Sequence, residues 1–144
     1  MRGLLVGVLL VVATILVVLY FAGEIGGPVL YLLPGEYRGW VGIRYNDPHC
    51  SPLRKEGWDT VVLIGANGRG CTSSSVPGGW RYVRYEYSYP DGKRQKVLRL
   101  DQDIWPIGVS GPQAPQIETL FVGSKAEMER AWPHEQDFER QMEQ

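Results

Sequence analysis

Residues 80–89 read W-R-Y-V-R-Y-E-Y-S-Y and place every second large side chain on one side of an extended chain: Val83, Tyr85, Tyr87 and Tyr89. Alternation with period two in β-branched and aromatic residues predicts a half-buried strand. The turn Pro90-Asp91-Gly92-Lys93 follows, and Gln95–Leu100 then pairs back with Leu98 and Leu100 facing inward. Asp-Gly between two alternating runs is one of the strongest hairpin indicators. This stretch therefore predicts an antiparallel β-hairpin.

Further strands are expected on both sides of this hairpin. The segment Gly39–Asn46 alternates, with Val41, Ile43 and Tyr45 opposite Trp40, Arg44 and Asn46, and Thr60–Ile64 is a short apolar run typical of a buried central strand. The remaining expected elements are an apolar run at Val29–Leu33, a return strand at Cys71–Ser75 after the turn at 66–70, and a last strand at Ile117–Val122. Segments 49–58 and 101–116 contain Pro and Gly and are expected to be irregular. About seven short strands predict an all-β fold, an antiparallel β-sandwich over residues 29–123.

The carboxyl-terminal segment, residues 124–144, is predicted to hold a short helix and an acidic tail. Ser124-Lys125-Ala126-Glu127 fits the capping box, in which the Ser and Glu side chains satisfy free backbone amides of the first turn. The helix is expected to end at Ala131 or Trp132, because Pro133 interrupts it. The tail beyond is expected to be a second frayed helix or disordered.

The amino-terminal segment, residues 3–23, has no charged residue and is almost entirely apolar. Twenty-one helical residues span roughly 30 Å, the thickness of the hydrocarbon core of a bilayer. We therefore predict one transmembrane helix that serves as an anchor. The alternative is a cleaved signal peptide, but its apolar region would be about 7–15 residues long, and the residues near the end of this run suit signal peptidase poorly.

Arg2 precedes the apolar run, and the next basic residue beyond it is Arg38. The positive-inside rule then places the amino terminus in the cytoplasm and the carboxyl-terminal domain outside it. The expected protein is single-pass in the cell membrane, with a short hinge at residues 24–28 that contains Gly26, Gly27 and Pro28.

Charge and cysteine content restrict the function of the exported part. Only one of the 15 Lys and Arg residues precedes residue 24, so the 121 residues from Glu24 onward carry 14 basic and 16 acidic groups. A slightly negative domain gives no electrostatic reason to expect nucleic acid as a partner. Two cysteines, Cys50 and Cys71, are expected to form a disulfide in an oxidising compartment. The alternative, a metal site or reactive thiol beside His49, has no second nearby His and no C-x-x-C spacing.

Three strings of sequence, in this order and spacing, resemble an uncharacterised family of bacterial extracytoplasmic domains. They are Tyr31-Leu32-Leu33-Pro34-Gly35-Glu36-Tyr37-Arg38-Gly39-Trp40-Val41; Gly70-Cys71-Thr72-Ser73-Ser74 with Gly79-Trp80; and Glu118-Thr119-Leu120-Phe121-Val122-Gly123-Ser124. Members usually follow a signal peptide or a lipid anchor. The resemblance implies a small extracytoplasmic β-domain of unknown function and assigns no functional residue. This chain differs in having a membrane segment without a lipid-attachment Cys.

Several residue groups could carry chemistry, and each has a simpler interpretation. Asp101 and Asp103 could bind calcium or act as acid and base, but they also suit a solvated strand end. The glycine-rich stretch 65–70 lacks the Lys-Ser/Thr and the following helix of a phosphate-binding loop and suits a turn. A disulfide would bring His49 near Thr72–Ser75, where a serine nucleophile would need a base and an orienting group. No cofactor, metal ligand or catalytic residue is assigned.

Aromatic residues give the remaining candidate site. Trp40 and Tyr82 lie opposite the apolar faces of their strands, so we expect them to be exposed and to bind a ligand or partner. The favoured function is a non-catalytic envelope module that binds another protein or a surface polymer. The alternative is a small extracytoplasmic hydrolase using His49 with a nearby Ser or Asp. A third possibility is a subunit of a membrane complex, since Gly3 and Gly7 have the small-xxx-small spacing of helix contacts.

Overall fold

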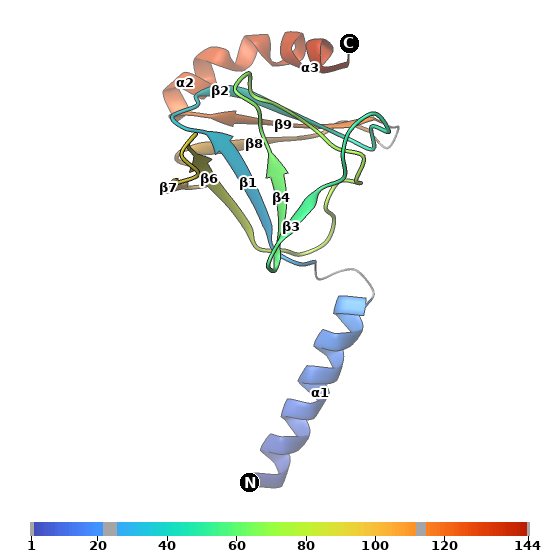
Figure 1. The fold of residues 1–144 in the computed structure, drawn as a ribbon. Helices are drawn as coiled ribbons and strands as arrows, with labels where there is room; N and C mark the ends of the chain where they lie inside the picture. The colour runs from blue at the N-terminus through green and yellow to red at the C-terminus, as the bar shows by residue number, and fades with distance from the viewer. Residues whose placement is uncertain (1, 22–25, 112–114, 144) are drawn as a thin grey trace.

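Two β-sheets packed face to face form the domain, as the computed structural model shows for residues 2–21, 26–111 and 115–143 (Figure 1). The five-stranded sheet has the order β3-β4-β1-β6-β7, and the four-stranded sheet has the order β5-β2-β9-β8. The strands are β1 (Val29–Pro34), β2 (Gly39–Tyr45), β3 (Arg54–Glu56), β4 (Asp59–Leu63), β5 (Arg69–Cys71), β6 (Val83–Ser88), β7 (Arg94–Leu98), β8 (Ile104–Val109) and β9 (Gln116–Val122). The predicted all-β, two-sheet fold is confirmed.

The strand pairing is mixed and not purely antiparallel as predicted. Strand β1 lies parallel to both β4 and β6, and β2 lies parallel to β5. The reason is visible in β1, where the residues Val29–Leu33 are all buried, as is typical of a central strand covered on both faces. Because β1, β4 and β6 run in the same direction, the first residues of all three lie at the same end of the sheet (Figure 1).

The turn after β4 leads the chain into the other sheet. The backbone N–H of Gly65 donates to the carbonyl of Arg69 at 2.9 Å, which closes the predicted turn. Strand β5 then pairs with β2, so the expectation that Cys71–Ser75 returns along β4 is wrong. Gly68 makes this path possible: it has φ +75°, and a Cβ there would lie 2.5 Å from the carbonyl oxygen of Trp40.

Two strands lie in segments expected to be irregular. Strand β3 pairs with β4, and β8 pairs with β9 at the edge of its sheet despite Pro106. A proline is compatible with an edge strand because its missing N–H need not donate to a second neighbour. The second strand of the predicted hairpin ends earlier than expected: Leu98 is buried, but Leu100 lies beyond β7 and is exposed, so its predicted inward orientation is wrong.

The core lies between the inner faces of the two sheets. Alternation along β2 and β6 is confirmed, since Val41, Ile43, Tyr45, Tyr85 and Tyr87 are buried as predicted. The remaining members are Val29, Tyr31, Leu33, Val62, Ile64, Leu98, Ile104, Leu120 and Val122. On β9 the inward-facing set, Leu120 and Val122, continues by alternation to an acidic residue, Glu118.

Helices cover the outer face of the four-stranded sheet (Figure 1). The predicted capping box is present at the start of α2 (Lys125–Ala131), and a 3-10 turn, η1 (Trp132–His134), leads into α3 (Glu135–Glu143). The tail is therefore an ordered helix that packs on β2 and β9. Met142 of α3 is buried against Gly42, where a Cβ would lie 2.9 Å from the Met142 side chain. The absence of a side chain at Gly42 thus lets α3 approach the sheet.

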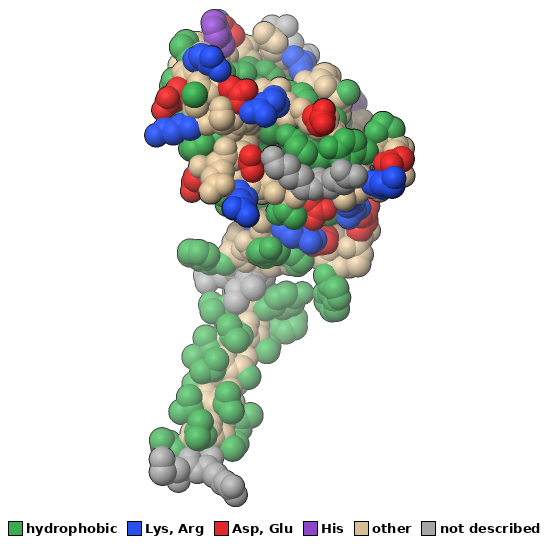
Figure 2. All heavy atoms as spheres, turned by 90° about the vertical axis from the view of Figure 1, so that its left-hand side faces the viewer, with side chains coloured by type: hydrophobic (Ala, Val, Ile, Leu, Met, Phe, Trp, Pro, Cys, Tyr) green, Lys and Arg blue, Asp and Glu red, His purple; other side chains and the backbone are tan. Residues whose placement is uncertain are grey.

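The amino-terminal helix α1 (Arg2–Phe21) is long and apolar enough to cross a membrane. Its window Leu4–Phe21 has a mean hydropathy of 3.0 and is not buried in the protein. Figure 2 shows apolar side chains along the visible face of α1, whereas charged side chains of both signs are scattered over the domain. Part of the predicted hinge, residues 24 and 25, lies outside the described residues.

A disulfide joins Cys50 to Cys71, with 5.8 Å between the two Cα atoms, as predicted. It ties the end of β5 to the turn after β2, where Cys50 also donates its N–H to the carbonyl of Asp47. The closed loop has a sequence separation of 21 residues. Cross-linking therefore removes a large set of conformations from the unfolded chain.

We predict that the variant Cys50→Ala/Cys71→Ala is less stable than the wild type by about 3 kcal/mol, the chain-entropy value for a loop of this size class. Chemical denaturation of both proteins measures the difference. Reduction of the wild type should produce a comparable loss and serves as the control for the two substitutions. Equal midpoints for oxidised wild type and variant would contradict the structural role of the disulfide.

Candidate functional site

Trp40 is half-buried and not exposed as expected. Its ring makes an edge contact with Phe121 of β9 at 5.2 Å between ring centroids and stacks on Phe138 of α3 at 6.2 Å. Because α3 covers this face of the sheet, Trp40 packs the helix against β2 and is not open to a partner. Tyr82 is exposed at 69%, so its predicted role in binding stays a prediction.

His49 is exposed, and its backbone N–H donates to Asp47 at 3.0 Å. The disulfide does bring this segment beside Thr72, but the Thr72 hydroxyl donates to the carbonyl of Ser51. Within the described residues, no hydrogen bond connects the His49 ring to a serine hydroxyl or a carboxylate. The arrangement needed for a serine nucleophile is therefore not assembled around His49.

The other weak candidates have structural roles. Asp103 accepts the backbone N–H of Arg99 at 3.1 Å, and Asp101 has φ 61°, so both residues shape the turn before β8. The glycine-rich stretch 65–70 forms the turn between β4 and β5. A carboxylate oxygen of Asp47 and the sulfurs of Cys50 and Cys71 lie within 4.8 Å of one another, but the disulfide consumes both thiolates that a metal would need.

Glu118 of β9 lies between the two sheets and accepts hydrogen bonds from tyrosines of both. The Tyr31 hydroxyl, from β1 in the five-stranded sheet, donates to Glu118 Oε2 at 2.8 Å, and the Tyr45 hydroxyl, from β2, donates to the same oxygen at 2.7 Å. The ring of Tyr85 stacks on Tyr31 at 4.8 Å. We call Tyr31, Tyr45, Tyr85 and Glu118 the tyrosine–glutamate cluster.

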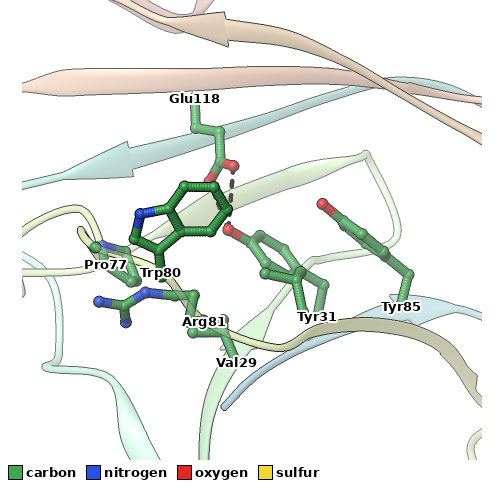
Figure 3. A pocket seen from close by; sticks show the side chains of 9 residues that line it. Val29, Tyr31, Pro77, Trp80, Arg81, Tyr85 and Glu118 are labelled. Atoms are coloured by element: carbon green, nitrogen blue, oxygen red, sulfur yellow. Dashed lines mark hydrogen bonds between the residues drawn. The ribbon is translucent and has the colours of Figure 1, made fainter. Parts of the chain in front are cut away.

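Three members of the cluster, Tyr31, Tyr85 and Glu118, line a pocket that is open to solvent and has a cavity volume of about 520 Å³. Its walls come from the first residues of β1 and β6 and from the segment before β6, including Val29, Val83, Pro77, Trp80 and Arg81. Figure 3 shows the Glu118 carboxylate on one side of the pocket and the Arg81 guanidinium on the other, with the Trp80 ring beside them. The volume is that of a site for a small ligand or one unit of a larger one.

Burial raises the pKa of Glu118, and hydrogen bonds from Tyr45 and Tyr31 lower it by a smaller amount. Burial also raises the pKa of Tyr31, Tyr45 and Tyr85, with the nearby charge of Glu118 adding to the effect. All three tyrosines therefore remain protonated at physiological pH, and Tyr31 and Tyr45 donate to Glu118. A carboxylate has about four acceptor positions, so Glu118 retains acceptor capacity for a ligand that donates hydrogen bonds.

Sequence reasoning missed Glu118 as a site residue, although the pattern contains the information. Alternation along Ile117–Val122 places Glu118 on the same face as Leu120 and Val122. An acid on an apolar strand face is rarely left without a partner. The partner Tyr31 could not be assigned, because its pairing depends on the packing of two sheets.

The chain belongs to a bacterial family of unknown function, DUF6843, whose model matches residues 26–119. The matched range contains β1 to most of β9 and includes Tyr31, Tyr45, Tyr85 and Glu118. The sequence resemblance to an uncharacterised bacterial family is thereby confirmed.

A crystal structure of a Bacillus anthracis protein assigned as a lipoprotein has a similar fold. The TM-score is 0.60 and the sequence identity is 23%, and the match covers 73% of this chain and 77% of that chain. No curated protein matches the chain significantly. The likeness establishes the fold alone.

We predict that the free energy of unfolding of Glu118→Gln increases, relative to that of the wild type, as the pH rises. A carboxyl whose pKa is higher in the folded than in the unfolded protein contributes stability below its unfolded pKa, and this contribution is lost as the pH rises through the folded pKa. The neutral amide has no such dependence. Denaturation of both proteins between pH 3 and pH 8 measures the difference in unfolding free energy.

The acid end of that series is an internal control, because both side chains are neutral there and any difference reflects packing alone. A constant difference across the series would mean that the pKa of Glu118 is the same in the folded and unfolded states.

Proposed function

We propose that this protein is a single-pass membrane protein, with its amino terminus in the cytoplasm, whose extracytoplasmic β-domain is a non-catalytic binding module of the bacterial envelope. The anchor proposal rests on α1 and on Arg2 preceding its apolar residues. The disulfide is consistent with an oxidising exterior, and so is the assignment of the Bacillus anthracis protein as a lipoprotein.

The observation that carries the binding role is the pocket around Glu118. It combines a half-buried carboxylate, a guanidinium and an exposed indole ring within one cavity. Such a combination suits a ligand with several hydroxyl or amine donors and an apolar face. We therefore favour a surface polymer of the envelope, such as a wall glycan, over a flat protein partner.

Hydrolysis receives less support from this pocket. Glycoside hydrolysis generally requires two carboxyl groups on opposite sides of the bond, and among the described lining residues Glu118 is the single acid. The alternative hydrolase at His49 lacks an assembled base and nucleophile, as described above. Binding without turnover is the function that these side chains fit best.

The test measures retention of the full-length protein, in detergent, on purified bacterial cell-wall fragments that still carry their polymers. We expect Glu118→Gln and Arg81→Gln each to weaken retention by about tenfold or more, because a hydrogen bond to a charged group contributes about 1.5–3 kcal/mol. Co-sedimentation over a range of fragment concentrations gives the apparent affinity.

Glu129→Gln is the matched control, because Glu129 is an exposed acid on α2 that lies outside the pocket lining. It should bind like the wild type. Wild-type protein that stays in the supernatant, or equal retention of Glu118→Gln and wild type, would contradict the proposal. Release of soluble sugars during incubation would instead favour the hydrolase.

A further inference from the structure

Three large aromatic side chains project into solvent at one end of the domain. Trp58 is exposed at 90%, Trp80 at 85% and Tyr82 at 69%. They come from two separate segments, the turn between β3 and β4 and the approach to β6. Exposed rings of this size are uncommon on a soluble surface unless they meet a partner or a membrane.

These residues flank the point where the chain arrives from α1. Gly26 donates its N–H to the carbonyl of Trp80 at 2.9 Å, and Val29 donates to the carbonyl of Tyr82 at 2.9 Å. On the other side, Thr60 donates to the carbonyl of Pro28 at 2.8 Å, two residues after Trp58. Parallel pairing of β1 with β4 and β6 is the cause, since it places the starts of all three strands together.

The chain is too short to let this end move far from the end of α1. Four residues, 22–25, separate Phe21 from Gly26, so the five steps between their Cα atoms span at most about 18 Å in a fully extended chain. The headgroup layer adds about 5–7 Å beyond each side of the hydrocarbon core. If α1 spans the bilayer, the three aromatic residues are therefore held within reach of the headgroups.

We infer that Trp58, Trp80 and Tyr82 form an aromatic rim that inserts into the headgroup layer of the membrane in which α1 is embedded. Trp and Tyr favour this layer because each has an apolar ring and one polar group that stays hydrated. Arg81 lies between two rim residues in the sequence, but its guanidinium belongs to the pocket of Glu118 and not to the rim (Figure 3). Figure 2 shows apolar side chains at the end of the domain nearest α1.

The inference rests on the proposed membrane anchor and adds an orientation to it. Val29, Val83 and Trp80 also line the pocket of Glu118, so the rim places the pocket at the membrane-facing end of the domain. A ligand bound there would be held close to the membrane surface and not at the far, helix-covered end.

The experiment uses the full-length protein in phosphatidylcholine vesicles, with or without lipids brominated on the acyl chains near the headgroup. Bromine quenches nearby tryptophan fluorescence, and α1 contains none of the five Trp residues. We expect Trp58→Phe to lower the quenched share of the fluorescence by about a third, from two of five tryptophans to one of four, because two rim tryptophans supply the interfacial signal. Trp132→Phe should leave that share unchanged or raise it.

Trp132 is the matched control because it is also exposed, at 51%, but lies in η1 at the opposite end of the domain (Figure 1). An equal quenched share in all three proteins, or little quenching in the wild type, would overturn the rim. Carbonate extraction is performed first: protein that leaves the vesicles disproves the anchor, whereas protein that stays and is not quenched disproves only the rim.

Discussion

The hydrogen bonds from Tyr31 and Tyr45 to Glu118 are the constraint on which the arrangement of the two sheets depends. An acidic side chain on the inner face of a sheet is costly unless donors reach it. Tyr45 supplies a donor from the adjacent strand of the same sheet, and Tyr31 supplies one from the opposite sheet. The contact joins β1 to β9 across the core, and the same carboxylate lines the open pocket.

Strand direction determines where that pocket lies in the molecule. Because β1, β4 and β6 are parallel, their first residues lie at the same end of the domain. Gly26, where the chain enters the domain, and the exposed rings of Trp58, Trp80 and Tyr82 lie at this end too. The helices α2 and α3 cover the outer face of the four-stranded sheet, at the opposite end of the domain (Figure 1). Phe138 of α3 packs against Trp40, and Met142 packs against Gly42. The domain is thus closed on its helical side and has its polar cavity on the side of the anchor.

The sequence was most informative where one local rule acted alone. Alternation located β2 and β6, the capping box located α2, and the cysteine pair predicted the disulfide. Prediction from the sequence failed for features that depend on contacts between distant segments. These are the parallel partners of β1, the pairing of β5 with β2 in the four-stranded sheet, and the packing of α3 over Trp40. The same limit hid the site, because the hydrogen bond between Glu118 and Tyr31 depends on how the two sheets pack together.

The most direct test of this account is an NMR titration of the Glu118 side-chain carboxyl carbon in the full-length protein, with the resonance assigned by its loss in Glu118→Gln. The account predicts a pKa above the ordinary value for glutamate, because burial between the sheets outweighs the tyrosine hydrogen bonds. It also predicts a further rise in Tyr45→Phe, where one donor to the carboxylate is lost. A Glu118 pKa at the ordinary value that does not change in Tyr45→Phe would show a solvated carboxyl and contradict the cluster between the sheets.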